Sequence, residues 1–387
     1  MSTSPRSSLG FSAALATALT LALTWWADSS GIRDGARHGL GGAPVGVAVT
    51  PDGGRVLVAA ADDDAVWVLD AVTGRRLGRQ ALDGAPLRFV PMRSLGRPVV
   101  LFDASTAVCA VHPFRERTLA TCFEPGEADV TDSHAAAPRV IGAVEGGDGA
   151  LVVALARFTR RDPTIRLRRF VPEPGERRWL QRGDSPWVPI PRGLADEGLW
   201  PMAAVADGGP IYLVVPGQGR MLAFDSQLAL AAEVPVSPSP RDLAISPDGE
   251  QAFVVDGPLG ELWKIALPSG QVRARVKVGP GAQSVALDAR RGAVWVAARS
   301  SGELVGLTTD TLAPLARLPV QSGTGAVAVD AQRRRLVASN FRHGTVASWA
   351  LAELDWLRDG GEAVASPAAS APPAPWTGRA QWLAEGA

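Results

Sequence analysis

The sequence contains few of the residues that enzymes commonly use to bind metals or to attack a substrate covalently. Only two cysteines and four histidines occur among its 387 residues. No CxxC or CxxCH spacing is present, which argues against a cysteine metal site and against covalently attached haem. The HExxH, GxSxG, phosphate-loop and dinucleotide motifs are also missing from any suitable context. The chain therefore offers no recognisable catalytic set.

The sequence also lacks an excess of charge of either sign. It has 39 basic and 39 acidic residues, so its formal net charge is zero. Without a global field, attraction to nucleic acid or to an anionic membrane is not expected. Lysine is rare, because Lys264 and Lys277 are the only basic residues that are not arginine. Since alanine and glycine are also abundant, we interpret this as a compositional bias of the genome.

What the chain does contain is a repeat. A five-residue β-type motif with alanine in fourth place occurs at 45–49, 241–245, 283–287 and 325–329. The alanines of the last three copies, Ala244, Ala286 and Ala328, are 42 residues apart (286 − 244 and 328 − 286). Ala204 is expected to hold the same place in a further unit. A fixed period of about forty residues, filled with short strands, is typical of propeller blades.

Each full unit reads as four strands joined by tight turns. In the fifth unit, strands at 243–245, 252–255, 261–265 and 272–278 are separated by turns such as Pro247-Asp248-Gly249. On this template the chain divides into seven units, at 45–82, 86–123, 138–191, 199–236, 240–278, 282–320 and 325–351. The sequence therefore predicts an all-β, seven-bladed β-propeller with four-stranded blades over 32–357.

The two ends of the chain differ from the repeats. The last unit is one strand short, and 32–40 resembles an outer strand, so we expect this N-terminal strand to close the ring. The apolar stretch at 9–27 predicts that 1–27 is a signal peptide or a membrane anchor. Either would export the propeller, which would then be periplasmic, secreted or membrane-anchored. Residues 363–387 read as a Pro/Ala-rich linker and tail, either disordered or a docking peptide.

The two cysteines are the sharpest local signal. The midpoint between Cys109 and Cys122 falls one 42-residue period after the Thr73-Gly74 turn of the first unit (115.5 − 73.5). The two residues should therefore lie opposite each other on neighbouring strands of the second blade. In an exported protein this predicts a disulfide, the alternative being two reduced, buried thiols.

The first and fifth units resemble a known repeat family. The segments 47–53 and 243–249 end in Pro-Asp-Gly, and 68–74 ends in Thr-Gly, as in the YVTN-type bacterial and archaeal β-propellers. The tetrapeptide that names that family is not preserved here. The resemblance implies a seven-bladed ring that is often exported. It implies little about activity, because the family includes surface proteins, lactonase-like enzymes and subunits of redox enzymes.

The loops between the second and third strands, with the connections between blades, should ring one mouth of the central channel. The polar candidates there are Asp62, Asp63, Asp103, Asp256, Arg299, Asn340 and His343. Such a rim would suit a polar ligand, or a divalent cation held by oxygen ligands, and no other cofactor is indicated. The alternative is an ordinary set of polar loops. The arginines of 157–169 suggest either an anion site or a strand with one buried face.

These observations favour an exported, non-catalytic binding module that presents the rim to a protein or polar ligand. A metal-dependent lactonase- or lyase-like enzyme is the alternative. In it Asp62, Asp103, Asp256 and Arg299 would hold a cation and substrate in the channel mouth, and His343 would act as general acid or base. An accessory subunit of a redox system is a third interpretation. Nucleic acid is not expected as a partner.

Overall fold

The computed structural model describes residues 36–40, 42–112, 119–126, 138–158, 163–173, 178–190, 198–206 and 208–351. The predicted signal or anchor at 1–27 and the predicted tail at 363–387 lie outside these residues. No helix in the described part of the chain has the length and apolar character needed to cross a membrane.

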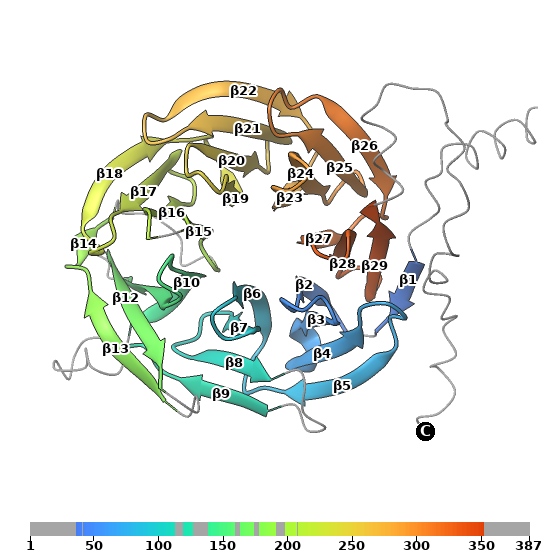
Figure 1. The fold of residues 1–387 in the computed structure, drawn as a ribbon, viewed down its shortest axis with the longest axis horizontal. Coiled ribbons are helices and arrows are strands. Elements are labelled where there is room, and N and C mark those ends of the chain that lie inside the picture. Colours follow the sequence, from blue (N-terminus) through green and yellow to red (C-terminus); the bar gives the residue numbers. More distant parts are fainter. Residues whose placement is uncertain are drawn as a thin grey trace, which may run out of the picture.

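Seven antiparallel sheets surround a central axis like the blades of a propeller (Figure 1). Blade 1 contains β2 (Pro44–Val49), β3 (Arg55–Ala60), β4 (Ala65–Asp70) and β5 (Arg76–Ala81), with the short 3-10 turn η1 (Ala61–Asp63) between β3 and β4. Blade 2 contains β6 (Pro86–Met92), β7 (Arg97–Phe102), β8 (Val108–His112) and β9 (Leu119–Phe123). Blade 3 contains β10 (Arg139–Glu145), β11 (Leu151–Arg157), β12 (Thr164–Pro172) and β13 (Trp179–Asp184), and β14 (Val188–Pro189) also pairs with β12.

The remaining blades follow the same order from the axis outwards. Blade 4 contains β15 (Met202–Ala204), β16 (Ile211–Val215), β17 (Arg220–Phe224) and β18 (Leu230–Pro235). Blade 5 contains β19 (Pro240–Ile245), β20 (Gln251–Asp256), β21 (Glu261–Ala266) and β22 (Gln271–Lys277). Blade 6 contains β23 (Ala282–Asp288), β24 (Ala293–Ala298), β25 (Glu303–Thr308) and β26 (Pro314–Pro319). Blade 7 contains β27 (Thr324–Asp330), β28 (Arg335–Asn340) and β29 (Thr345–Ala350). The predicted seven-bladed, four-stranded architecture is confirmed.

Blade 7 receives its outer strand from the beginning of the chain. β1 (Ala36–Gly39) runs antiparallel to β29, with Ala36 opposite Ser348 and Gly39 opposite Thr345. The Leu40 N–H then donates to the Gly344 carbonyl at 2.7 Å. Figure 1 shows β1 in blue at the outer side of blade 7. How much this strand contributes to closing the ring stays a prediction.

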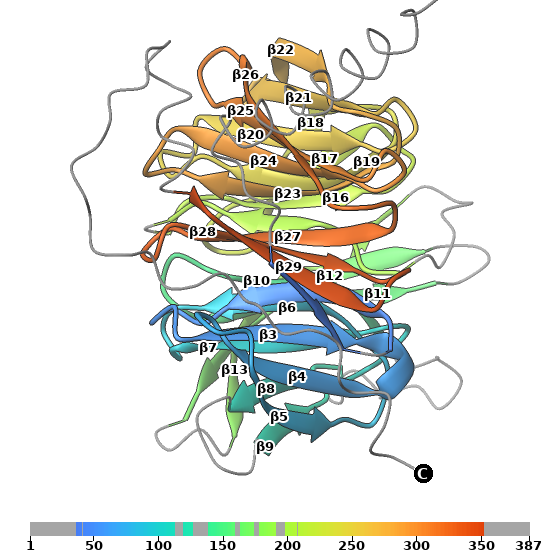
Figure 2. The ribbon, with the colours of Figure 1, turned by 90° about the vertical axis from the view of Figure 1, so that its right-hand side faces the viewer.

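In the part of the chain that the structure describes, the core is divided into seven apolar clusters, each lying between two neighbouring blades. Because successive side chains of a strand face opposite sides, each inner strand serves two clusters. In β19, Leu243 packs towards blade 4, whereas Ala244 packs towards blade 6. The edge-on view in Figure 2 shows these blades stacked face against face. The repeated alanine therefore marks the face that each inner strand presents to the next blade.

Blade 4 corrects the expected position of this alanine. Ala203, not Ala204, faces the cluster shared with blade 5, and Ala204 faces the cluster shared with blade 3. The register agrees, since Ala203 lies opposite Tyr212 as Ala244 lies opposite Phe253. The prediction was one residue off, because this short inner strand carries two consecutive alanines.

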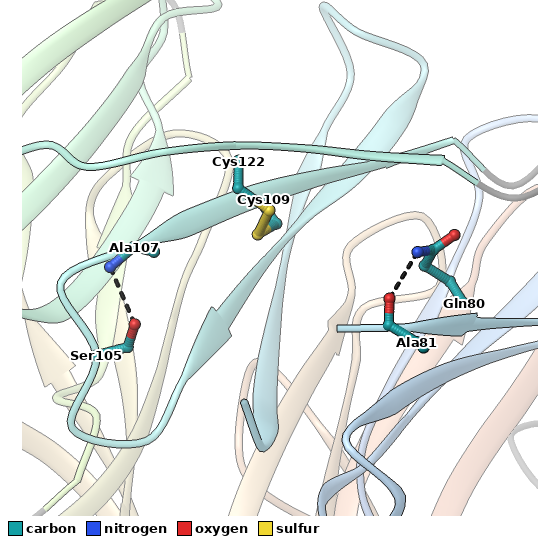
Figure 3. Close-up of a disulfide and its surroundings, with 6 residues drawn as sticks. All are labelled: Gln80, Ala81, Ser105, Ala107, Cys109 and Cys122. Carbon is teal, nitrogen blue, oxygen red and sulfur yellow. Dashed lines mark hydrogen bonds between the residues drawn. A yellow bond between two sulfur atoms is a disulfide. The ribbon is translucent and has the colours of Figure 1, made fainter. Parts of the chain in front are cut away.

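The predicted disulfide is confirmed. Cys109 in β8 and Cys122 in β9 lie directly opposite each other, with their Cα atoms 4.0 Å apart, and their sulfur atoms are bonded (Figure 3). The bond joins the two outermost strands of blade 2. The 42-residue period was sufficient to place both residues.

Candidate functional site

The loops between second and third strands lie beside the connections that join successive blades. A repeated backbone hydrogen bond shows this: Asp103 N–H donates to Ala85, Arg299 N–H to Gly281 and Phe341 N–H to Gly323, at 2.9 to 3.2 Å. Both kinds of loop therefore form one face of the ring. We call this face the rim. Its described loops are 61–64, 103–107, 216–219, 257–260, 299–302 and 341–344, with connections 82–85, 236–239, 278–281 and 320–323.

Asp256 was predicted as a ligand of this rim, but its buried side chain joins two neighbouring loops by hydrogen bonds. We call a residue with this role a clip. Asp256 ends β20 and is 0% exposed. Its Oδ2 accepts the Ser239 N–H and its Oδ1 accepts the Leu259 N–H, both at 2.8 Å. One carboxylate thus ties the connection entering blade 5 to the loop leaving β20. Both oxygens are used inside the protein, so Asp256 is not presented to a ligand.

Asn340 plays the same part in blade 7. Its Nδ2 donates to the Gln321 and Ser322 carbonyls at 3.1 Å, and its Oδ1 accepts the Arg342 and His343 N–H groups at 3.1 Å. Only an amide supplies donors and acceptors together in this way. Asn340 is buried, and it is the single asparagine of the chain. It too was predicted as a ligand, but its side-chain amide is fully engaged in hydrogen bonds within the protein.

The other five candidates lie on the rim with different exposure. Asp63 is half-buried, and its Oδ2 accepts the Trp67 indole N–H at 3.1 Å. Asp62, Asp103, Arg299 and His343 are exposed. The Arg299 guanidinium lies 4.2 Å from the centre of the Phe341 ring. The Asp103 loop is shaped by Ser105, whose Oγ accepts the Ala107 N–H at 3.0 Å (Figure 3).

Exposed charges of opposite sign occupy different parts of the rim. An acidic arc over blades 1 and 2 consists of Asp62, Asp64, Asp83 and Asp103. A basic arc over blades 6 and 7 consists of Arg299, Arg342 and His343. Because blade 7 lies beside blade 1, the two arcs adjoin (Figure 1). Within the described part of the chain, none of these side chains belongs to an ion pair.

The described residues do not assemble the cation site that the enzyme alternative requires. No group of three or more His, Cys, Asp and Glu side chains is placed there to hold a metal ion. Asp256 is turned inwards, and the exposed acids are spread over the loops and the connection of blades 1 and 2. What the rim presents, over the residues that can be described, is a set of separated charges on fixed loops.

Below the rim, an ion pair that the sequence did not reveal crosses the central axis. Arg88 in β6 and Asp242 in β19 come from blades on opposite sides of the ring (Figure 1), and Arg88 Nη2 lies 3.3 Å from Asp242 Oδ1. Asp242 Oδ2 also accepts the Val285 N–H at 3.0 Å. Both residues stand third in their inner strands, just after a β-bulge. The sequence signal that could have indicated this pair is the equivalent spacing of Pro86 and Arg88 in one unit and of Pro240 and Asp242 in another.

The arginine-rich strand of blade 3 is used by the fold. Ile165 and Leu167 are buried, which confirms the interpretation of β12 as a strand with an apolar face. Arg168 is also buried, at 1% exposure, and donates to the Pro125 carbonyl at 2.6 Å. Arg169 donates to the Ser226 carbonyl at 2.6 Å. These described arginines therefore join neighbouring segments rather than form a free anion site.

The fold and the rim define a β-propeller of seven blades with a charge-separated loop face. Three solved structures illustrate the class. A chain of Kuenenia stuttgartiensis hydrazine synthase is 16% identical, with a TM-score of 0.61 over 80% of this chain and 95% of that one. The Myceliophteria thermophila Cps50 (Swd1) β-propeller domain is 12% identical, with a TM-score of 0.60 over 82% and 99%. Virginiamycin B lyase from Staphylococcus aureus is 11% identical, with a TM-score of 0.59 over 81% and 97%.

These likenesses show the fold alone, because the identities are low and the three proteins differ in function. No family model matches the sequence, and no curated protein matches it. The resemblance of the Pro-Asp-Gly units to the YVTN-type propellers therefore stays a prediction.

Proposed function

We propose that this protein is an exported β-propeller that binds a protein or polar ligand at its rim and does not itself catalyse a reaction. The observation that carries the proposal is the pairing of an acidic arc with a basic arc on one face. Exposed charges without ion partners remain available to a ligand, and they steer a partner of complementary charge.

The rim loops are also held in shape before any ligand arrives. Asp256 and Asn340 each tie a loop to the neighbouring blade connection through buried hydrogen bonds. Loops ordered in advance lose less conformational entropy on binding, so the same contacts yield a higher affinity. Asn340 in particular holds the loop that carries the exposed Arg342 and His343 of the basic arc.

Two features support export. The Cys109–Cys122 disulfide suits an oxidising compartment, because cytosolic thiols are normally kept reduced. The apolar stretch at 9–27 is the expected export or anchoring segment. The partner should therefore be sought in the cell envelope or outside the cell.

The positions of the two arcs predict the charge distribution of the partner. A protein or ligand that docks here would bring positive charge to blades 1 and 2 and negative charge to blades 6 and 7. An electrostatic interface of this kind weakens as salt is added, because exposed charges are screened over about 10 Å at 0.1 M salt.

The test compares three immobilised proteins in their ability to retain partners from the envelope fraction, quantified by mass spectrometry. They are the unaltered protein, a rim variant carrying Asp62→Ala and Asp103→Ala, and a control carrying Glu250→Ala and Asp310→Ala. The control residues are exposed acids on turns of the opposite face.

A partner lost from the rim variant and kept by the control supports the proposal, and a cytochrome among such partners would favour the redox-subunit interpretation. Equal retention by all three proteins would contradict it. Turnover of a defined substrate that the rim substitutions abolish would replace it with the enzyme alternative.

A further inference from the structure

The ion pair across the axis lies at the rim side of the inner strands. Arg88 and Asp242 are each the third residue of an inner strand, and each inner strand begins at a rim connection. In the described inner strands, the residues at the equivalent bulge position include Gly46, Gly142 and Ser284, which carry no charge. Among these described bulge positions, Arg88 is therefore the one basic residue.

Asp242 and Arg88 differ in how many of their polar atoms are bonded within the protein. Asp242 has a side chain 12% exposed, and its second oxygen accepts the Val285 N–H. Arg88 has a side chain 34% exposed, and its contact with Asp242 is a single nitrogen–oxygen approach of 3.3 Å. A guanidinium engaged two-pronged by a carboxylate would show two parallel contacts, shorter than this one. Within the described part of the chain, the other donors of Arg88 make no further hydrogen bond.

The pair contributes little to holding the ring together. Asp242 is buried, but Arg88 is partly exposed and makes a single contact of 3.3 Å, so water screens the pair from one side and its net stabilisation is small. Asp242 keeps the Val285 N–H whether or not Arg88 is engaged. A second carboxylate could thus take the free edge of Arg88 without leaving a buried charge uncompensated.

From this geometry we infer that Arg88 forms a subsite for a carboxylate group beneath the rim. The free edge of its guanidinium would donate two parallel N–H bonds to the two oxygens of the incoming group. This inference rests on the proposed function, since it names the ligand chemistry of the same face. No covalent step is involved.

The surrounding charges favour a singly charged group over a phosphate dianion. Asp242 lies beside the subsite, and the acidic arc of blades 1 and 2 stands above the strand that carries Arg88. These carboxylates would repel a doubly charged group about twice as strongly as a singly charged one. A carboxylate can come from a small organic acid or from the C-terminus of a polypeptide, and the two sources are distinguished by experiment.

The experiment uses the purified full-length protein and two kinds of probe. The first is ¹³C-labelled acetate, followed by its NMR line width. The second is a pair of fluorescent tetrapeptides of one sequence, one with a free C-terminal carboxylate and one amidated, followed by polarisation. The variants are Arg88→Gln, Arg88→Lys and Arg241→Gln. Arg241 precedes Asp242 on the same strand, but its side chain packs over Gly257 on the rim, which makes it a matched control.

Acetate is expected to bind the unaltered protein and Arg241→Gln alike. It should bind Arg88→Gln about tenfold more weakly, and Arg88→Lys should fall between, because lysine keeps the charge and loses the planar fork. A free-carboxylate peptide that binds more tightly than both acetate and its amide identifies a polypeptide C-terminus. A peptide no tighter than acetate identifies a small acid.

Two results would overturn the subsite: no saturable carboxylate binding to the unaltered protein, or equal binding by Arg88→Gln. If Arg88→Gln does not fold, as judged by thermal unfolding, the comparison of Arg88→Lys with Arg241→Gln decides. The subsite and the proposed function fail separately. Partner loss in the rim variant together with unchanged acetate binding by Arg88→Gln would remove the subsite and leave the rim interface standing.

Discussion

The interface between blades 5 and 6 and the interface between blades 2 and 3 distribute side-chain size in opposite ways. In the first, Ala244 of β19 shares a cluster with Val285 of β23. In the second, the equivalent positions hold Val90 of β6 and Ala143 of β10, which share a cluster of their own. In the first pair the smaller residue belongs to the earlier blade, and in the second pair it belongs to the later blade.

The comparison teaches that these two interfaces keep one small and one larger residue in the facing pair, although the two sizes are exchanged between the blades. Protein interiors are packed as densely as organic crystals, so a facing pair must fill its space without excess. The alanine that recurs in the sequence marks only those interfaces whose larger residue belongs to the next blade. Blades 2 and 3 look degenerate in sequence, yet they meet through the same geometry.

The largest effect on stability is expected at Asp256 of blade 5, because blades 2 and 3 have no such clip at the equivalent strand ends. β20 ends in Asp256, whereas β7 and β11 end in Phe102 and Arg157. Asp256→Ala removes two hydrogen bonds that a buried carboxylate accepts from part-buried N–H groups, and should lower the free energy of unfolding by about 4 kcal/mol. Urea unfolding measures this. Asp248→Ala, at an exposed turn of the same blade, is the control and should cost about 1 kcal/mol or less.

A second prediction concerns the interface between blades 7 and 1, where distant parts of the chain meet. Removal of residues 1–39 takes away the four residue pairings of β1 with β29 and exposes a strand edge. We expect a loss of stability on the order of 3 kcal/mol, measured by thermal unfolding. Removal of 1–35 keeps β1 and should have little effect. Equal melting temperatures for the two truncations would mean that β1 does not close the ring.

The volume argument itself is tested by exchanging the two sizes. Ala244→Val overfills the blade 5–6 interface and Val285→Ala leaves a cavity, so each alone should cost about 2 kcal/mol. The double variant copies the blade 2–3 arrangement and should recover at least about 1 kcal/mol of the summed cost in a double-mutant cycle. Strictly additive costs would show that the two interfaces are not interchangeable.

The smallest expected effect is on acid stability and belongs to the Pro-Asp-Gly turns. The Ser246 hydroxyl and the Glu250 N–H donate to Asp248 and hold the pKa of that carboxyl below its ordinary value. In Asp52 of blade 1, burial raises the pKa, but bonds from Thr50 and Gly54 and the nearby Arg333 and Arg55 outweigh it.

A carboxyl whose pKa is lowered in the folded state stabilises the protein above its unfolded pKa, about 3.9. That contribution is lost as pH falls through the lower, folded value. Thermal unfolding between pH 5 and pH 2 should therefore show a smaller acid loss in Asp248→Asn than in the unaltered protein. Because Asp248 is exposed and screened, the difference should be under about 1 kcal/mol. Asp310→Asn, at an exposed turn, is the matched control.

The fold could be predicted because its signals are local and repeated. Turns of the Pro-Asp-Gly type, strand-length apolar runs and a 42-residue period specify blades without reference to distant parts of the chain. Cys109 and Cys122 could be paired because both lie in one hairpin. Ala204 was misplaced because two adjacent alanines cannot be ordered without the register of the facing strand.

The rim could be located but its members could not be assigned roles. Asp256 and Asn340 are polar residues at strand ends, and nothing local distinguishes a clip from a ligand. The difference lies in the blade connections that approach them from 17 to 20 residues earlier in the chain. Arg88 and Asp242 meet only when blades on opposite sides of the ring converge. Such contacts depend on the closing of the ring, and they leave no periodic pattern in the sequence.

The clip of blade 7 also makes the rim open to spectroscopy. Because Asn340 is the sole asparagine, ¹⁵N-asparagine labelling yields one backbone amide signal and one side-chain amide pair from the whole protein. That side chain contacts the loop carrying Arg342 and His343 and the connection entering the same blade. A ligand that settles on the basic arc would shift a single, already assigned set of resonances, so occupancy of this face could be followed in a protein of this size without any further assignment.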